Sequence, residues 1–287
     1  MSDVDQKEEE RIKRGGSPES QIKAFELLLR ASEAKEVTVR DDEYDYSWLL
    51  DSAKLCKKRG CCFRLIDSGK LELSQMEWLA GAGAEIFTSD EARPRALELE
   101  LLSQMCRSAG SFVACFQHGT LEEDEEKSGS ISIQELMNLG ISGVYLHISN
   151  KDKKRDFSLL NSLAHSCRKG GSWLVYYHHG LLEASLEELA CHGAWIHLSD
   201  QSLIEAEEIS LLLDTIKSAR RAGTNLVFHL EKGADASLLR EMIKAGVYLQ
   251  FDLSHLAVSP ELQTFFRRWE KRRMDSKAYY LWSHFLP

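Results

Sequence analysis

The 287-residue chain has few prolines and no long apolar run. Its densest apolar stretch, from Trp173 to Tyr177, is far shorter than the ~20 residues that a membrane-spanning helix needs. The first residues, Met1 to Gly16, are charged and contain no apolar segment of the kind that marks a secretory signal. We therefore expect no membrane partner and a cytoplasmic location.

The cysteines form no recognisable pattern, and positive charge is not in excess. The seven cysteines are odd in number, include no C-x-x-C pair and match no structural zinc spacing. Buried thiols in a reducing compartment are the expectation. The formal net charge of −9 argues against a general affinity for polyanions, so no nucleic-acid partner is expected.

What the chain does contain is a repeat of a strand–helix–strand–helix unit. Each unit begins with a β-rich run that ends at a Gly, continues through a short helix, and reaches a second β-rich run. The first runs lie at 61–69, 111–119, 172–180 and 225–233, and the second runs at 84–90, 144–150, 194–200 and 247–253. A further second-type run lies at 36–41. Such alternation predicts parallel strands with right-handed crossovers.

This pattern predicts an α/β fold, a TIM-type (β/α)8 barrel built from internal (βα)2 repeats. Eight units close such a barrel, and the nine runs found here leave a possible ninth strand. An open doubly wound parallel sheet is the alternative. We expect residues 1–16 to be a disordered tail and residues 17–287 to form a single domain. That domain would begin with a helix from Ser17 to about Ser32, carry a surface loop at 122–130, and end in a helical, aromatic segment.

Period-two alternation assigns the side chains of each strand to two faces. In the second-type runs one face is aliphatic, so the other is expected to line the barrel interior. The expected interior set is Glu36, Thr38, Arg40, Glu85, Phe87, Ser89, Tyr145, His147, Ser149, Trp195, His197, Ser199, Tyr248, Gln250 and Asp252. The Gly-terminated runs would add Phe63, Leu65, Asp67, Val113, Cys115, Gln117, Leu174, Tyr176, His178, Val227, His229 and Glu231. Arg64 fits this division poorly, and a slip of one residue would exchange the faces of a strand.

The polar members of this set would gather at the C-terminal ends of the strands, where barrel enzymes place their chemistry. Asp67, His178 and Glu231 are the candidate catalytic groups for proton transfer or metal binding. The candidate ligand-binding residues are Arg40 as an anion anchor, with Gln117, Ser149, Ser199 and Asp252. Alternatively, the polar side chains hydrogen-bond one another across a polar core.

Residues 54–93 resemble TIM barrels of the thiamine-phosphate-synthase type. The matching run is RLIDSG followed by LAGAGAEIFTSDEARP, in which two strands each reach an Asp. The resemblance implies a divalent metal such as magnesium as cofactor, bound by Asp67 and Asp90. The Gly-rich phosphate loops of that family have no counterpart later in the chain.

Two functions remain open from the sequence. The first is an enzyme-like barrel that binds a small polar or anionic metabolite at the C-terminal mouth. The second is a non-catalytic, enzyme-derived barrel that serves as a scaffold or protein-binding module, and the absence of a known catalytic motif favours it. The aromatic segment Tyr279–Phe285, after the basic run 265–273, is a candidate contact for a protein partner or a second subunit.

Overall fold

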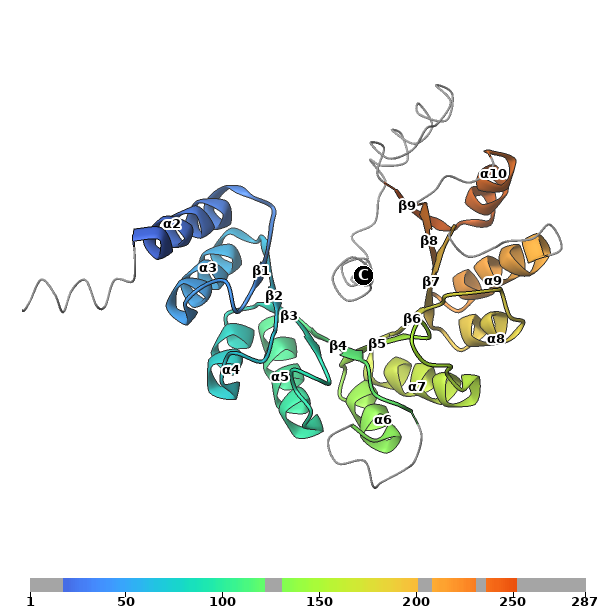
Figure 1. The fold of residues 1–287 in the computed structure, drawn as a ribbon, viewed down its shortest axis with the longest axis horizontal. Helices are drawn as coiled ribbons and strands as arrows, with labels where there is room; N and C mark the ends of the chain where they lie inside the picture. Colours follow the sequence, from blue (N-terminus) through green and yellow to red (C-terminus); the bar gives the residue numbers. More distant parts are fainter. Residues whose placement is uncertain (1–17, 122–130, 201–207, 231–235, 252–287) are drawn as a thin grey trace, which may run out of the picture. The chain divides into compact units, whose positions relative to one another are not determined.

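The computed structural model describes residues 18–121, 131–200, 208–230 and 236–251. Within these residues nine helices alternate with nine parallel strands (Figure 1). The chain divides into two compact units, of which the first runs to Ala114 and the second from Cys115 onward, apart from Pro94–Ala96, which group with the second. Each unit is described by itself below.

Unit 1 is a three-stranded parallel arrangement with its helices along one side (Figure 1). Strand β1 pairs with β2, and β2 pairs with β3. Helix α2 begins at Pro18, as expected for a proline at the first helical position. The elements are α2 (Pro18–Glu33), β1 (Glu36–Arg40), α3 (Tyr46–Arg59), β2 (Cys62–Ile66), α4 (Leu73–Gly81), β3 (Glu85–Ser89) and α5 (Ala96–Ala109).

Unit 2 continues the same alternation, beginning in β4 (Val113–Gln117), and strands β5 to β9 pair in parallel in sequence order. Its helices lie along one side of these strands (Figure 1). The further elements are α6 (Ile133–Ile141), β5 (Tyr145–Ser149), α7 (Phe157–Gly170), β6 (Leu174–Tyr177), α8 (Ser185–Cys191), β7 (Trp195–Ser199), α9 (Ile209–Arg221), β8 (Leu226–Leu230), α10 (Ala236–Ala245) and β9 (Tyr248–Phe251).

The predicted α/β class, the parallel strands and the ninth strand are confirmed. In each unit the strands follow one another in sequence order, whereas a doubly wound sheet reverses its order at one point. Helix lengths also alternate: α3, α5 and α7 have 14 residues and α9 has 13, whereas α4 and α6 have 9, α8 has 7 and α10 has 10. Within the described residues, the longer helices among α3 to α10 are those that follow β1, β3, β5 and β7.

The register corrects the predicted faces of three Gly-terminated strands. Directly paired residues of parallel strands share a face, and His147 pairs with Val175 while Tyr177 pairs with His197. The strand β6 therefore places Val175 and Tyr177 on the histidine side, and Tyr176 on the other side against Phe157 of α7. The prediction that Leu174, Tyr176 and His178 share the face of His147 was wrong.

The predicted faces of β2 and β4 are exchanged in the same way. Arg64 pairs with Glu85 and therefore lies on the face assigned to Glu85, while Leu65 and Asp67 lie on the opposite one. In β4 the ring of Phe116 contacts Tyr177, which turns Gln117 to the other face. Both faces of these strands are buried, so polarity could not distinguish them. The prediction for β8, with His229 beside His197, was correct.

Two further expectations concerned the state of the cysteines and membrane-spanning helices. All seven cysteines are free, and burial raises the pKa of Cys106 and Cys167 to about 12. Among the residues that the structure describes, no helix is long and apolar enough to cross a membrane.

Candidate functional site

Four aromatic side chains form a continuous polar row in unit 2, on the face of β5 to β8 opposite Tyr176 and α7. We call this row, His147, Tyr177, His197 and His229, the histidine face. His147 Nδ1 lies 2.9 Å from the Tyr177 hydroxyl, and His197 Nδ1 lies 2.8 Å from His229 Nε2. The rings of Tyr177 and His197 bridge the two pairs at a centroid distance of 4.6 Å.

Burial fixes the charge state of this row. All four side chains are at most 3% exposed. Burial lowers the pKa of His197 to about 3 and lowers those of His147 and His229 well below the usual range, because a charged imidazolium would lose its hydration. Burial likewise raises the pKa of Tyr177 well above its usual range. The histidine face is therefore neutral at physiological pH.

Neutrality constrains the hydrogen bonds. A neutral imidazole has one N–H donor and one bare acceptor nitrogen, so in the His197–His229 pair one ring must donate and the other accept. In the His147–Tyr177 pair the hydroxyl can donate to Nδ1, which puts the imidazole proton on Nε2. The histidine face is thus an ordered network of donors and acceptors with no net charge.

Two residues on this side of the sheet each carry a buried nitrogen without a partner and are level with each other. These nitrogens are His147 Nε2 and the indole Nε1 of Trp195. His147 pairs with Val175, and Val175 pairs with Trp195, so all three lie at one level on neighbouring strands. With strands 4.7–4.9 Å apart, the backbones of His147 and Trp195 are about 10 Å apart, separated by the small Val175 side chain.

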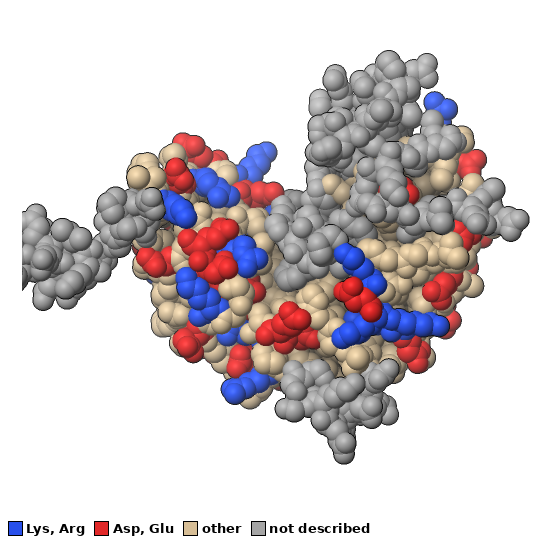
Figure 2. All heavy atoms as spheres, in the orientation of Figure 1, with Lys and Arg blue, Asp and Glu red and all other residues tan. Residues whose placement is uncertain are grey.

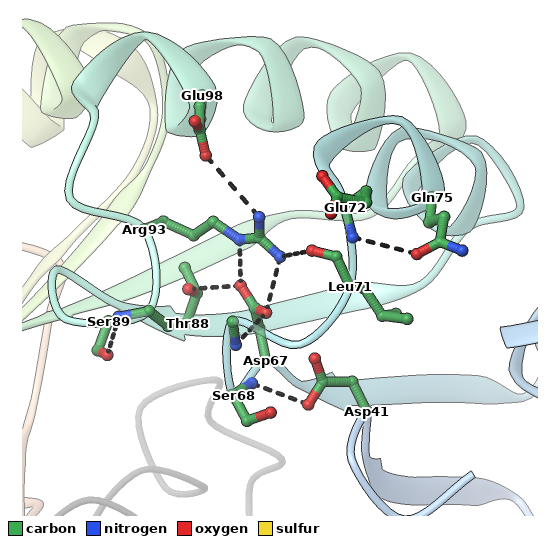
Figure 3. A network of polar contacts seen from close by, with 12 residues as sticks. Asp41, Asp67, Ser68, Leu71, Glu72, Gln75, Thr88, Ser89, Arg93 and Glu98 are labelled. Atoms are coloured by element: carbon green, nitrogen blue, oxygen red, sulfur yellow. Dashed lines mark hydrogen bonds and ion pairs between the residues drawn. The ribbon is translucent and has the colours of Figure 1, made fainter. Parts of the chain in front are cut away.

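The candidate residue Asp67 lies elsewhere, in a buried network of unit 1 (Figure 3). Its Oδ2 accepts hydrogen bonds from Thr88 Oγ1 and Arg93 Nε, both at 2.8 Å, and its Oδ1 accepts from Gly69 N at 2.9 Å and Arg93 Nη2 at 3.1 Å. Arg93 also donates to the Leu71 carbonyl. The network joins the loop after β2 to the loop after β3.

This environment does not fit the predicted roles of Asp67. Both carboxylate oxygens face the Arg93 guanidinium, whose charge and hydrogen bonds occupy the directions that a magnesium ion or a substrate proton would need. Asp90 is also buried, but the described residues contain no group of three or more His, Cys, Asp or Glu side chains arranged to hold a metal. Asp67 is a loop-anchoring residue in this structure.

His178 is engaged in a comparable way in unit 2. Its Nε2 lies 2.7 Å from the Leu181 carbonyl, which can only accept, so Nε2 carries the proton. Its Nδ1 then accepts from Asn150 Nδ2 at 3.3 Å. Burial lowers the pKa of His178. Both ring nitrogens hold the loop after β6, and neither faces the histidine face.

The predicted ligand-binding residues are not gathered at one place. Arg40 is exposed and paired with Asp42 at 3.1 Å in unit 1. In unit 2, the Gln117 amide is buried without a partner on the face opposite the histidine face. Ser149 and Ser199 lie on the same side of the sheet as the histidine face, where Ser149 pairs with Tyr177 and Ser199 pairs with His229. Glu231, Asp252, the tail 1–16, the loop 122–130 and the C-terminal segment lie outside the described residues.

Sequence reasoning missed two arginines that organise the strand ends. Arg93 anchors Asp67, and Arg155 occupies the corresponding place in unit 2, where it donates to the carbonyls of Ser149 at 2.8 Å and Gly119. Each lies in the loop after a second-type strand, before the next helix, and an arginine at that place in both loops was the available signal. On the side of the molecule drawn in Figure 2, acidic and basic side chains of the described residues are interspersed.

Comparison with known proteins adds little. No protein-family model matches the chain, and no curated protein matches it. Among solved structures, a putative fructose-1,6-biphosphate aldolase from Coccidioides immitis is 15% identical over 71% of this chain and 76% of that one, with a TM-score of 0.34. A putative lyase/mutase from Burkholderia cenocepacia is 14% identical over 93% of this chain and 94% of that one, with a TM-score of 0.33. Likeness at this level says nothing about activity.

Proposed function

We propose that unit 2 binds a small, uncharged polar molecule at the histidine face. The observation that carries this proposal is the pair of buried, unpartnered nitrogens, His147 Nε2 and Trp195 Nε1, at one level of the sheet. A buried polar atom without a partner costs about 1–3 kcal/mol, so a network that served only packing would be expected to satisfy both. A ligand that accepts or donates at these two positions recovers that cost.

The chemistry of the face favours a ligand without charge. None of the residues that β5 to β8 place on this side is Lys, Arg, Asp or Glu, and the imidazoles are neutral. An anion would lose its hydration here without gaining a cation. Alcohols, amides and carbonyl compounds of a few carbons match the available donors and acceptors.

This proposal differs from the acid–base site expected from the sequence. Asp67 and His178 use their polar atoms to hold loops, so the proposal assigns them no contact with the ligand. The proposed function is therefore binding, with His147 and Trp195 as the contacting residues and Tyr177 as the residue that orients His147.

A stability measurement separates a binding face from a polar core. We expect the double variant His147→Phe/Tyr177→Phe to be as stable as the native protein or more so in urea unfolding, because it removes an unpartnered donor and replaces a buried polar pair by rings of similar size. Tyr176→Phe, on the opposite face of the same strand, is the matched control. A loss of more than about 2 kcal/mol in the double variant alone would show that the polar pair supports the fold.

The ligand itself is tested with uncharged probes. Acetamide, glycerol, glyceraldehyde and ribose are each added to the native protein, and the melting temperature is followed, because a ligand that binds only the folded state raises it. We expect at least one probe to raise it, and His147→Phe/Tyr177→Phe to abolish the rise. Absence of any rise, together with destabilisation of the double variant, contradicts the proposal.

A further inference from the structure

A surface groove lies on the helical side of unit 1, far along the chain from any residue of the histidine face. It has a volume of about 690 Å³ and is formed by α3, α4 and α5, which lie next to one another in Figure 1. Lys54 and Lys58 border it from α3, Trp78 and Gly81 from α4, and Met105 from α5. Nothing in the proposed function of unit 2 uses it.

The residue at the end of α4 explains why the groove exists. Helix α4 ends at Gly81, which has no side chain to fill the space between α3 and α5. A Cβ atom added at Gly81 would meet only the methyl group of Met105, at 3.6 Å. The space beyond the end of α4 is therefore left open.

The matching place in unit 2 is built differently. Aligning the second-type strands puts Ile141 at the position of Gly81, and Asn138 at the position of Trp78. One residue earlier, Gly140 brings α6 close to α7: an added Cβ there would come within 3.1 Å of Cys167 Sγ. In unit 2, the close approach of α6 to α7 and the branched side chain of Ile141 take the place of the open space beside Gly81 in unit 1.

The walls of the groove combine an apolar surface with unpaired positive charge. Trp78 is 68% exposed and Met105 is 40% exposed, so the indole ring and the thioether face solvent. Lys57 Nζ donates to the Gly81 carbonyl at 3.0 Å and so satisfies the end of α4. Lys54 and Lys58 make no hydrogen bond or ion pair to any described residue, and Glu77 is the single acidic residue of the lining.

We propose that this groove binds an amphipathic monoanion, a carboxylate carried on an alkyl or aromatic body. The volume lies within the roughly 300–1,000 Å³ of small-molecule sites. The apolar body would cover Trp78 and Met105, and burial of such area contributes about 25 cal/mol per Å². The carboxylate would lie between Lys54 and Lys58, one helical turn apart on the same face of α3. Three lysines against one glutamate make the lining positive in a chain whose net charge is −9.

Sodium decanoate, used below its micelle concentration, is the probe. Binding is measured by isothermal titration calorimetry and located by NMR of the Met105 methyl group, which the variant Met105→Leu assigns among six methionines. Decanamide has the same body without the charge, and acetate has the charge without the body. We expect decanoate to bind and shift the Met105 signal, with decanamide and acetate at least tenfold weaker.

Three variants decide the assignment. Gly81→Ile, which copies Ile141, should abolish binding by filling the groove, and the double variant Lys54→Gln/Lys58→Gln should weaken it at least tenfold. Lys169→Gln, at the position in α7 that corresponds to Lys58, should leave it unchanged. The lysine variant keeps the test valid if Gly81→Ile does not fold.

Several results would overturn the proposal. Equal affinity for decanoate and decanamide would show that Lys54 and Lys58 do not bind the carboxylate. Binding that leaves the Met105 signal unmoved places the ligand elsewhere. Binding of decanoate only as part of phosphatidylcholine vesicles indicates a lipid surface, and failure to bind decanoate at millimolar concentration leaves the groove without its proposed ligand.

Discussion

The two units have chemically different residues at one corresponding strand position, a charged residue in unit 1 and an apolar one in unit 2. In unit 1, Arg64 of β2 pairs across the sheet with Glu85 and donates to Glu85 Oε2 at 2.9 Å and to Glu36 Oε2 at 2.8 Å. In unit 2 the corresponding residue of β6 is Val175, and its directly paired neighbours are His147 and Trp195.

The difference teaches where each unit can respond to a ligand. The Arg64 side chain is 6% exposed and its guanidinium bonds to two carboxylates, so its charge is compensated within the protein. Val175 offers no polar atom, and the His147 and Trp195 nitrogens beside it stay without partners in the described structure. At this level of the sheet, unit 1 pairs the Arg64 charge with carboxylates of the protein. Unit 2 instead has the His147 and Trp195 nitrogens, which could still form hydrogen bonds to a ligand.

The largest loss of stability is expected when the arginine found at position 64 in unit 1 is introduced at the corresponding position 175 in unit 2. Val175→Arg buries a guanidinium among neutral rings with no carboxylate within the described face, and it also overpacks the strand, so we expect a loss of at least about 4 kcal/mol in unfolding free energy. Val175→Met adds comparable length without charge and should cost about 1–3 kcal/mol. Urea unfolding followed by circular dichroism measures both, and equal losses would show that size rather than charge matters.

Copying Val175 into unit 1 is the reverse experiment. Arg64→Val removes the partner of Glu85, whose side chain is only 16% exposed, and leaves space behind, so we expect a loss of about 2–4 kcal/mol. Glu85→Gln in the same chain should restore part of it, because the amide no longer carries an uncompensated charge. No recovery in the double variant would indicate that the lost packing of Arg64, and not its charge, was responsible.

Acid should weaken the histidine face through His197, His147 and His229. The pKa of His197 is lowered to about 3 by burial, and those of the other two are lowered as well, so below pH 6.5 the unfolded chain binds protons that the folded one does not. Stability is therefore full above pH 6.5 and falls as the pH drops below it. His197 alone contributes a loss of about 1.4 kcal/mol per pH unit down toward pH 3, and His147 and His229 add to the loss in the same direction.

The measurement is urea unfolding at pH 7.0 and pH 5.5. Between these values His197 alone accounts for about 1.3 kcal/mol, because the loss begins only near pH 6.5. His197→Phe should reduce the difference by that amount, whereas His165→Gln, which changes an exposed histidine of α7, should leave it unchanged. A native protein equally stable at both values would mean that the imidazoles accept protons without penalty.

The comparison also marks what the sequence could predict. Gly after every helix from α3 to α10 and the alternation of β-rich and helical runs were enough for the helices, the strands and their parallel order. The second-type strands were assigned to the correct faces because one side is aliphatic and the other carries groups such as His147 and Trp195. In β4 and β6 both sides are apolar or aromatic, and in β2 only Arg64 speaks against the predicted division. The pairing in space was therefore needed to show that Arg64 and Tyr177, not Asp67 and His178, share the face of the second-type polar residues.

The site was harder to predict from the sequence than the fold, because its residues were chosen from those faces. Asp67, Gln117 and His178 occupy one position of the repeat, the last before the loop, and a sequence cannot show that a loop closes around it. The contacts that decide its role come from Arg93 and from Asn150, each more than twenty residues away along the chain. A polar residue at a strand end is compatible with catalysis and with loop anchoring alike until its partners are known.

The smallest effect is expected at the exposed edge of the Arg64 network. The Glu36 side chain is 44% exposed and its bond to Arg64 is shared with Glu85, so Glu36→Gln should cost no more than about 1 kcal/mol. Raising the salt concentration should reduce that difference further, because the charge is accessible to ions, whereas the cost of Arg64→Val should change little. Urea unfolding of the two variants at 0.05 M and 0.5 M NaCl measures this. A cost for Glu36→Gln as large as that of Arg64→Val would mean that Glu85 alone does not compensate the buried charge of Arg64. Arg64 would then depend on both carboxylates together.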